Sequence, residues 1–343
     1  MRARDGRVLA MALALLLTAT AAACGASSSS TSTDDTSGAS APTSLPGSTD
    51  RSGPSGRPVS SVDPIGVGVR RLVVTDPTRS TAARPPQAAA EGRVLPLTVR
   101  YPIDAPAAEV EVDDGPPFGT WPLIVFAHGF EASATTYAPL LRDLAASGFV
   151  VVAPEFPLST STGIGPAVEG DEPAQARDVD FLIDLLTGPD APPSIGPLVE
   201  AGPVGVMGHS DGAQTVLLTG YSPSYINRRI GAVVAVSGRY SSFGGRWFGS
   251  GAPPLLVVQS ATDELNPFAY GVELVQKDPH TAVLVAVDGT DHLGAVTDAR
   301  AVVPVAHLLA DSFAWWLRGS EAARRRLAGD ESTSPLRLVA AHD

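Results

Sequence analysis

The sequence is poor in cysteine, in aromatic residues and in positive charge, and each shortage excludes a class of protein. Its 343 residues include a single cysteine, which excludes a fold held by internal disulfides. Aromatic side chains make up 6% of the chain, but 44% of the residues are hydrophobic, which is enough for a substantial core. The formal net charge of −12 argues against a nucleic-acid partner, because such a protein needs a basic face to neutralise phosphates. An acidic surface also gains no electrostatic attraction to an anionic membrane.

The apolar run near the N-terminus is too short for a typical membrane-spanning helix. It extends from Val8 to Ala23 and has 16 residues, whereas a spanning helix needs about 20. Three arginines and one aspartate precede it and give residues 1–23 a charge of +2, so the rest of the chain carries −14. Because small residues end the run, residues 1–23 are predicted to be a secretory signal peptide.

The only cysteine, Cys24, follows this run directly. The segment 21–24 resembles a bacterial lipobox, although such motifs usually carry leucine at the position of Ala21. We therefore expect Cys24 to be lipidated, with palmitate among its acyl chains, and to hold the mature protein at the outer face of the cytoplasmic membrane. Cleavage without lipidation would give a secreted protein instead. Residues 24–64 are rich in Ser, Thr and Pro and are predicted to form a disordered tether.

Residues 65–343 are predicted to form one domain, in which continuous apolar runs alternate with segments of helical spacing. An alternating strand is expected over 95–101, and buried strands over 123–126, 149–153, 204–207, 232–236, 255–258 and 283–287. Helices are expected over 134–147, 174–186, 213–218 and 302–316. This order indicates an α/β fold with a mainly parallel, doubly wound sheet flanked by helices. Functional loops should then gather at the carboxyl ends of the strands.

The strongest motif is Gly-His-Ser-Asp-Gly at positions 208–212. An apolar strand is expected before it and a helix after it, which is the context in which a sharp turn lifts a serine hydroxyl above the sheet. The start of that helix also favours negative charge at this point. Ser210 is therefore the candidate nucleophile, and the alternative interpretation is a plain strand-to-helix turn.

A serine nucleophile needs a general base and a carboxylate that orients the base. In sheets with such a turn these groups follow the serine in the order acid, then histidine. His292 is the best candidate base, since it lies in a loop just after the apolar run 283–287. Asp263 is the best candidate acid, because it follows the run 255–258, one strand earlier, within reach of the ring of His292. The carboxylates that stay open as alternatives are Glu264, Asp288 and Asp291.

The negative charge that develops on a substrate oxygen needs two preorganised hydrogen-bond donors. One should be the backbone amide of Asp211, the residue after the nucleophile. The other should come from the loop after the run 123–126, where we select the amide of Phe130. We expect His128 to brace this loop and not to react.

Together these residues resemble the bacterial branch of the α/β-hydrolase superfamily that groups dienelactone-hydrolase-like, platelet-activating-factor acetylhydrolase-like and cutinase-like polyester hydrolases. The resemblance extends from about residue 93 to residue 316 and includes segments 126–130, 137–141, 148–154 and 176–181, the serine motif, and Asp291-His292. It implies an α/β-hydrolase fold and a Ser210–His292–Asp263 triad. It also implies hydrolysis of carboxylic esters through an acyl-enzyme, with no metal and no cofactor.

The chain departs from these relatives at two positions. Asp211 stands where polyester hydrolases usually carry methionine, which argues against polymer substrates, and Ser210 stands where dienelactone hydrolases carry cysteine. The sequence contains no insertion large enough to indicate a lid domain. Residues 158–172 are expected to form a loop long enough to shape the pocket. We expect a small-molecule or lipid ester as substrate, and a membrane contact only through the lipid anchor. The alternatives are a thioesterase, a lysophospholipase or platelet-activating-factor acetylhydrolase-like lipid hydrolase, and a non-catalytic envelope lipoprotein that binds a ligand.

Overall fold

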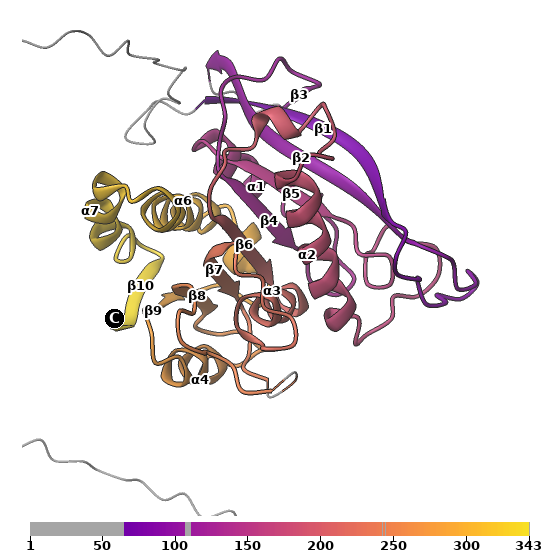
Figure 1. Ribbon diagram of the computed structural model, residues 1–343. Coiled ribbons are helices and arrows are strands. Elements are labelled where there is room, and N and C mark those ends of the chain that lie inside the picture. The colour runs from indigo at the N-terminus through magenta and orange to yellow at the C-terminus, as the bar shows by residue number, and fades with distance from the viewer. Residues whose placement is uncertain (1–64, 107–110, 242, 244, 343) are drawn as a thin grey trace, which may run out of the picture. The chain divides into compact units, whose positions relative to one another are not determined.

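The computed structural model describes residues 65–106, 111–241, 243 and 245–342, all within one compact unit. The predicted signal peptide, Cys24 and the tether lie outside the described residues. Within the described part, a single mixed sheet lies between two layers of helices (Figure 1). No helix in this part of the chain combines the length and the apolarity needed to cross a membrane.

The sheet has ten strands in the order β10-β9-β8-β7-β6-β4-β5-β2-β1-β3. Its six central strands run parallel to one another, as the apolar runs predicted, and nearly all of their residues are buried. Strands buried on both faces read as continuous apolar sequence, which explains why these six were visible in the sequence. They are β4 (Leu123–Ala127), β5 (Val150–Pro154), β6 (Val204–His209), β7 (Ile230–Val236), β8 (Leu255–Ser260) and β9 (Ala282–Val287).

The outer strands pair antiparallel, apart from a short parallel pairing at one edge. They are β1 (Ile65–Asp76), β2 (Arg93–Pro106), the two-residue β3 (Val112–Asp113) and β10 (Leu336–His342). The alternation predicted for residues 95–101 is present in β2, where Leu95, Leu97 and Val99 are buried and Val94 and Pro96 are exposed. The segment 77–92 joins β1 to β2 at the tip of a long hairpin that reaches beyond the sheet (Figure 1).

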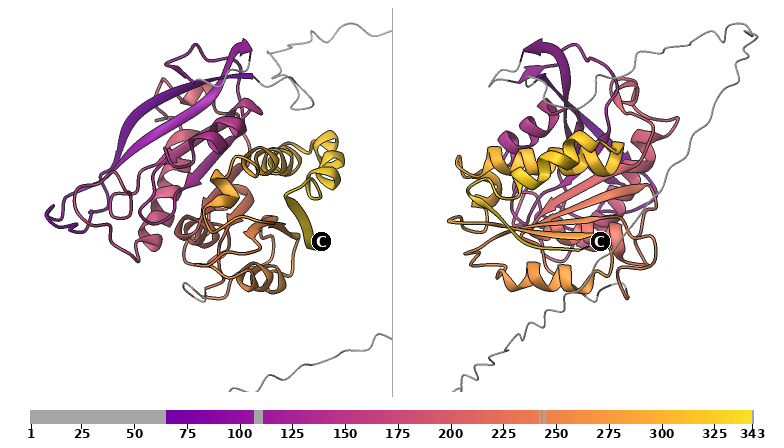
Figure 2. Two further views of the ribbon diagram at one scale, coloured as in Figure 1. Left: turned by 180° about the vertical axis from the view of Figure 1, so that it is seen from behind. Right: turned by 90° about the vertical axis from the view of Figure 1, so that its left-hand side faces the viewer.

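The helices divide between the two faces of the sheet and close a separate apolar core on each. One core contains residues of α2 (Glu172–Thr187), α3 (Asp211–Tyr221) and α4 (Ala269–Lys277). The other contains residues of α1 (Ala138–Ala146), the short α5 (Gly294–Thr297), α6 (Val302–Arg318) and α7 (Glu321–Asp330). The right-hand view of Figure 2 shows α4 and α6 on opposite sides of the strands. A further single-turn helix, η1, spans Gly196–Leu198.

Candidate active site

Ser210 lies at the junction of β6 and α3, where the chain turns sharply. Its φ of 56° and ψ of −120° place it outside the regions that L residues prefer. Such a conformation costs about 1–3 kcal/mol and persists where surrounding contacts enforce it. Here the Ser210 N–H donates to the carbonyl of Val236 on β7 (3.0 Å), and the Ser210 carbonyl accepts from the N–H of Ala213 (2.9 Å). The turn presents the half-exposed serine at the carboxyl end of the sheet.

The two glycines of the motif allow this turn because the strand end and the helix start approach very closely. A Cβ on Gly208 would collide with the backbone of Gly212. A Cβ on Gly212 would in turn collide with the backbone carbonyls of Ala127, the last residue of β4, and of His128, the residue after it. The motif therefore holds Ser210 against the loop that follows β4.

Asp263 and His292 come from the loops after β8 and β9 and form a hydrogen-bonded pair. The Nδ1 atom of His292 lies 2.8 Å from Oδ2 and 2.9 Å from Oδ1 of Asp263. The carboxylate is buried, and it also accepts from the N–H groups of Leu265 (3.0 Å) and Asn266 (2.7 Å) and from the Gln259 amide (3.0 Å). Since the ring donates from Nδ1, Nε2 of a neutral His292 carries the lone pair that a base needs.

Two of the alternative acids have other partners. Oδ1 of Asp291 accepts from the backbone N–H of Gly294 (2.7 Å), within its own loop. Oε2 of Glu264 accepts from the backbone N–H of His292 (3.1 Å) and so holds the loop and not the ring. Of the acids weighed from the sequence, Asp263 is the one that hydrogen-bonds the imidazole in the described structure.

The ring of His292 lies beside the serine turn. It packs on the ring of His209, the residue before Ser210, with 4.7 Å between the ring centroids. The charge of a protonated His292 would also lower the pKa of the Asp211 carboxyl, the residue after Ser210. Three loops, after β6, β8 and β9, thus bring the predicted serine, acid and histidine to one edge of the sheet.

The loop after β4 contains Phe130, the expected oxyanion donor, and His128, the residue expected to brace this loop. His128 is buried; its Nε2 accepts from the N–H of Phe156 (3.0 Å) and its Nδ1 donates to the carbonyl of Gly129 (2.7 Å). Burial lowers the pKa of His128 to about 4, so the ring is neutral and bonded at both nitrogens, as a brace requires. The amide N–H groups of Phe130 and Asp211, both half-buried, donate to no acceptor among the described residues. These are the two amides that the sequence predicted as oxyanion donors.

Comparisons with known proteins give one family-model match and one structural match. A family model described as Chlorophyllase matches residues 99–238, a segment that contains Ser210 and Asp211 and ends before Asp263 and His292. A solved structure, the ferulic acid esterase from Streptomyces cinnamoneus, matches with a TM-score of 0.62 and 18% identity, over 83% of this chain and 98% of that chain. No curated protein matches the chain.

The chain has the α/β-hydrolase fold. The fold expected from the sequence is therefore confirmed, and both matches support the expectation of a carboxylic ester hydrolase. The fold accounts for the chain order of the candidate residues. In α/β-hydrolases the serine comes first along the chain, the acid second and the histidine third.

The loop between β5 and α2 is held by a residue that no sequence pattern indicated. Arg84, at the tip of the β1–β2 hairpin, is 3% exposed. Its guanidinium donates to the carbonyls of Pro157 (3.1 Å), Gly165 (2.9 Å) and Pro166 (3.0 Å), all in the loop between β5 and α2. The hairpin tip therefore pins this loop across about 80 residues of sequence, and no local pattern around Arg84 indicates it.

Carboxylates from three segments influence one another beside the serine. Burial raises the pKa of Asp211, while Arg239 opposes this rise and Glu169 adds to it. Burial also raises the pKa of Glu172, at the start of α2, with further repulsion from Asp211. Arg239, in the loop after β7, is the cation that offsets both groups. The surroundings of Ser210 are thus more negative than positive.

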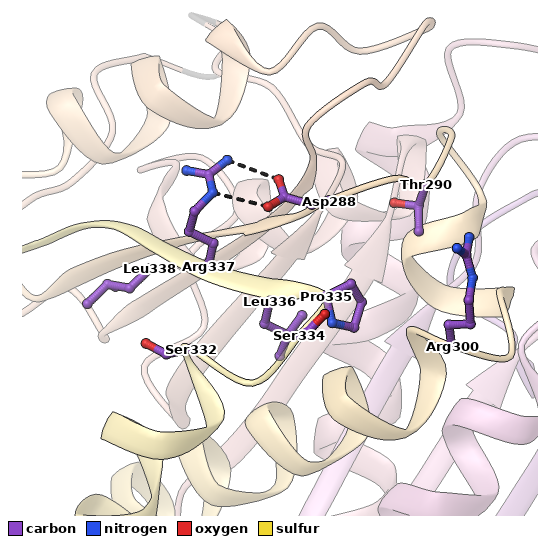
Figure 3. Close-up of a pocket in the computed structure, with 9 residues that line it drawn as sticks. All are labelled: Asp288, Thr290, Arg300, Ser332, Ser334, Pro335, Leu336, Arg337 and Leu338. Atoms are coloured by element: carbon purple, nitrogen blue, oxygen red, sulfur yellow. Dashed lines mark hydrogen bonds and ion pairs between the residues drawn. The ribbon is translucent and has the colours of Figure 1, made fainter.

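A groove of about 520 Å³ lies behind the histidine loop and contains none of the three residues of the predicted triad (Figure 3). It is bounded by Thr290 and by the segment 332–338 that leads into β10. The third alternative acid, Asp288, lines this groove and pairs with Arg337 (3.0 Å), as the dashed lines in Figure 3 mark. Asp288 therefore serves the join between β9 and β10 and not the imidazole.

Proposed function

We propose that this α/β-hydrolase is a serine carboxylic ester hydrolase that uses Ser210 as nucleophile, His292 as general base and Asp263 as the carboxylate that orients the base. The observation that carries the proposal is the buried Asp263–His292 pair, whose ring packs against the residue before a strained serine turn. A neutral imidazole held at Nδ1 by a carboxylate is the arrangement that activates a serine hydroxyl.

The reaction follows from the roles of these groups. Oγ of Ser210 attacks the ester carbonyl carbon while Nε2 of His292 takes its proton. The oxyanion of the tetrahedral intermediate accepts hydrogen bonds from the amides of Phe130 and Asp211. When the intermediate collapses, protonated His292 gives its proton to the departing alcohol. Water, with His292 again as base, then attacks the acyl-enzyme and releases the acid.

The substrate class that fits this site is an uncharged small-molecule or lipid ester. The carboxylates of Asp211, Glu169 and Glu172 influence one another beside the serine, and a negatively charged ester would be repelled there. The named relatives, a chlorophyllase family and a ferulic acid esterase, support an ester as substrate. A thioester reacts through the same steps, so a panel of oxygen esters and thioesters of graded acyl length distinguishes an esterase from a thioesterase or a lysophospholipase-like enzyme.

Ser210→Ala tests the proposal. We expect turnover of p-nitrophenyl butyrate to fall by about 10⁵- to 10⁶-fold, the range seen when the nucleophile of a triad is removed. Ser332→Ala, on an exposed turn beside β10, is the matched control and should keep full activity. A fluorophosphonate probe should label the wild-type protein and the control but not Ser210→Ala. An unlabelled, folded wild-type protein would favour a ligand-binding lipoprotein instead.

We propose further that residues 1–23 are removed as a signal peptide and that Cys24 is lipidated, with residues 24–64 as the tether of the catalytic domain, 65–343. The protein would then act at the outer face of the cytoplasmic membrane. Growth with a fatty-acid analogue should label the wild-type protein and leave Cys24→Ala unlabelled. An unlabelled wild type, or equal label on Cys24→Ala, would refute lipidation of Cys24.

A further inference from the structure

A buried chain of hydrogen bonds joins two loops of the proposed site through side chains to which the reaction assigns no role. The N–H of Gly129 donates to the hydroxyl of Tyr137 (3.1 Å). That hydroxyl lies 3.0 Å from Nδ1 of His209, whose Nε2 lies 3.0 Å from the backbone carbonyl of His292. Tyr137 is 0% exposed and His209 is 2% exposed, so water does not compete for these contacts. We call this chain of contacts the Tyr137–His209 bridge.

The direction of each hydrogen bond in the bridge is determined by its two ends. At one end the Gly129 N–H can only donate, so the Tyr137 oxygen accepts. At the other end the carbonyl of His292 can only accept, so Nε2 of His209 carries a proton. Burial lowers the pKa of His209 to about 4, and its ring is therefore neutral, with one proton. Nδ1 of His209 must then accept, and the Tyr137 hydroxyl donates to it.

Both ends of the bridge lie on the backbone of proposed site residues or their neighbours. Gly129 directly precedes Phe130, whose amide is one of the two proposed oxyanion donors. The other end is the carbonyl of the general base itself, His292. That carbonyl also lies 3.4 Å from Oγ of Ser237, and the His292 N–H is held by Glu264. The backbone of the base is thus held at its N–H and at its carbonyl, which leaves the imidazole to transfer protons.

The rings of the bridge are packed as well as hydrogen-bonded. Tyr137 contacts Phe126 of β4 edge-on, with 4.7 Å between the ring centroids, and lies 5.6 Å from His209. His209 in turn packs on His292 at 4.7 Å. A change in either bridging side chain would therefore be transmitted to the ring of the base.

We propose that Tyr137 and His209 are positioning residues for the ester hydrolysis. Together they fix the position of the general base relative to the loop that carries the Phe130 amide. This inference rests on the proposed function. It assigns His209 a role distinct from that of Ser210 beside it: the imidazole of His209 transfers no proton during the reaction and serves as a fixed donor to the carbonyl of His292. Because the bridge places reacting groups and does not bind substrate, its loss should lower kcat and leave KM unchanged.

Two variants of His209 separate the hydrogen bond from simple packing. His209→Leu removes both ring nitrogens, whereas His209→Gln keeps an amide N–H at about the same reach as Nε2. We expect kcat for p-nitrophenyl butyrate to fall about 10²-fold in His209→Leu, the effect of misplacing reacting groups by about 1 Å. The glutamine variant should recover most of this loss, because it still donates to the His292 carbonyl.

Tyr137→Phe tests the other half of the bridge and has a matched control. The phenylalanine ring fills the same space but leaves the Gly129 N–H and the Nδ1 of His209 without a partner. Tyr221→Phe removes an equally buried hydroxyl, which donates to the carbonyl of Pro253 (3.1 Å) at the far end of α3. Both variants should lose a similar amount of thermal stability, but only Tyr137→Phe should lose kcat, by about 10-fold or more.

The outcomes distinguish failure of this inference from failure of the proposed function. If the wild-type protein neither hydrolyses esters nor reacts with a fluorophosphonate, the proposed function is wrong. If it does both, equal kcat values in Tyr137→Phe and Tyr221→Phe overturn the bridge. Equal kcat values in His209→Leu and His209→Gln also overturn it. Should His209→Leu not fold, the tyrosine pair decides the question alone.

Discussion

Replacing Asp263 by asparagine would test the role of the buried carboxylate in the proposed triad. Oδ1 of Asp263 accepts from the backbone N–H groups of Leu265 and Asn266, at 3.0 and 2.7 Å. The oxygen of an asparagine would take this place, because its NH2 group cannot accept from them. The NH2 would then point at Nδ1 of His292, where Oδ2 of the carboxylate now lies at 2.8 Å.

Two donors would face each other in that arrangement, so His292 would have to change its tautomer. Nδ1 would present its lone pair to the asparagine, and the single proton of the neutral ring would move to Nε2. A protonated Nε2 cannot accept the proton of Ser210. Triads that suffer this change lose about 10⁴-fold in kcat, which corresponds to about 5.4 kcal/mol of transition-state stabilisation. The fold should persist, because the two backbone contacts remain.

The assay is kcat for p-nitrophenyl butyrate at neutral pH, with the melting temperature of each variant measured alongside. Asp291→Asn is the matched control, since Asp291 lies next to His292 but, within the described residues, accepts only from the backbone N–H of Gly294 in its own loop. We expect the control to lose less than about 10-fold, as for a single hydrogen bond. A smaller loss in Asp263→Asn than in Asp291→Asn would refute the assignment of the acid.

Three further predictions concern the surroundings of the triad and the fold. Arg84→Ala removes three contacts to the loop between β5 and α2; we expect KM to rise several-fold with kcat little changed, and limited proteolysis to cut this loop first. Asp211→Asn removes a partly buried carboxylate beside Ser210; the ratio of kcat/KM for a carboxylate-bearing ester to that for a neutral ester should rise about 5-fold at low salt. Burial beside Asp311 raises the pKa of Asp330 to about 7. The folded state holds the proton of Asp330 more tightly than the unfolded state does. The contribution of this group to the free energy of unfolding is therefore fully present below about pH 4 and is lost as the pH rises through about 7. Asp330→Asn should reduce the fall in melting temperature between pH 5 and pH 8, and an unchanged fall would contradict the assignment.

The parts of this fold that were predictable are those that leave a local pattern. The six central strands are buried on both faces and therefore read as continuous apolar runs. The serine turn is local as well, because Gly208 and Gly212 are required by contacts within five residues and with the adjacent strand end. Asp263 and His292 could be placed because parallel strands bring their carboxyl ends to one edge, a rule that needs no side-chain detail.

Two of the elements that were missed, β10 and α7, have weak patterns. In β10 only Leu336 is fully buried, and in α7 only Ala323 and Leu327 are, since each element covers an edge of the fold. The helix expected over 134–147 begins instead at residue 138, with Pro139 in its first turn, where the missing N–H costs nothing. Residues 134–137 form turns that support the loop after β4.

Long-range contacts of single side chains were out of reach for a different reason. Arg84 contacts carbonyls more than 70 residues away, and any arginine in a loop has the same local sequence signal. His209 stands inside the most conspicuous motif of the chain, yet that motif does not say which way its ring turns. The direction is decided by the hydroxyl of Tyr137 and the carbonyl of His292, one from before α1 and one from after β9.

The candidate site combines two parts of the chain, one that contains Ser210 and one that contains His292, and these parts meet at the backbone carbonyl of His292. The Chlorophyllase model covers residues 99–238, which include the proposed nucleophile and both proposed oxyanion donors, whereas the proposed base lies beyond them. Two side chains of the covered part, His209 and Ser237, lie within hydrogen-bond distance of the backbone carbonyl of His292. Because these contacts use the backbone and not the imidazole, they can hold the proposed base without perturbing the proton transfer that we assign to its ring.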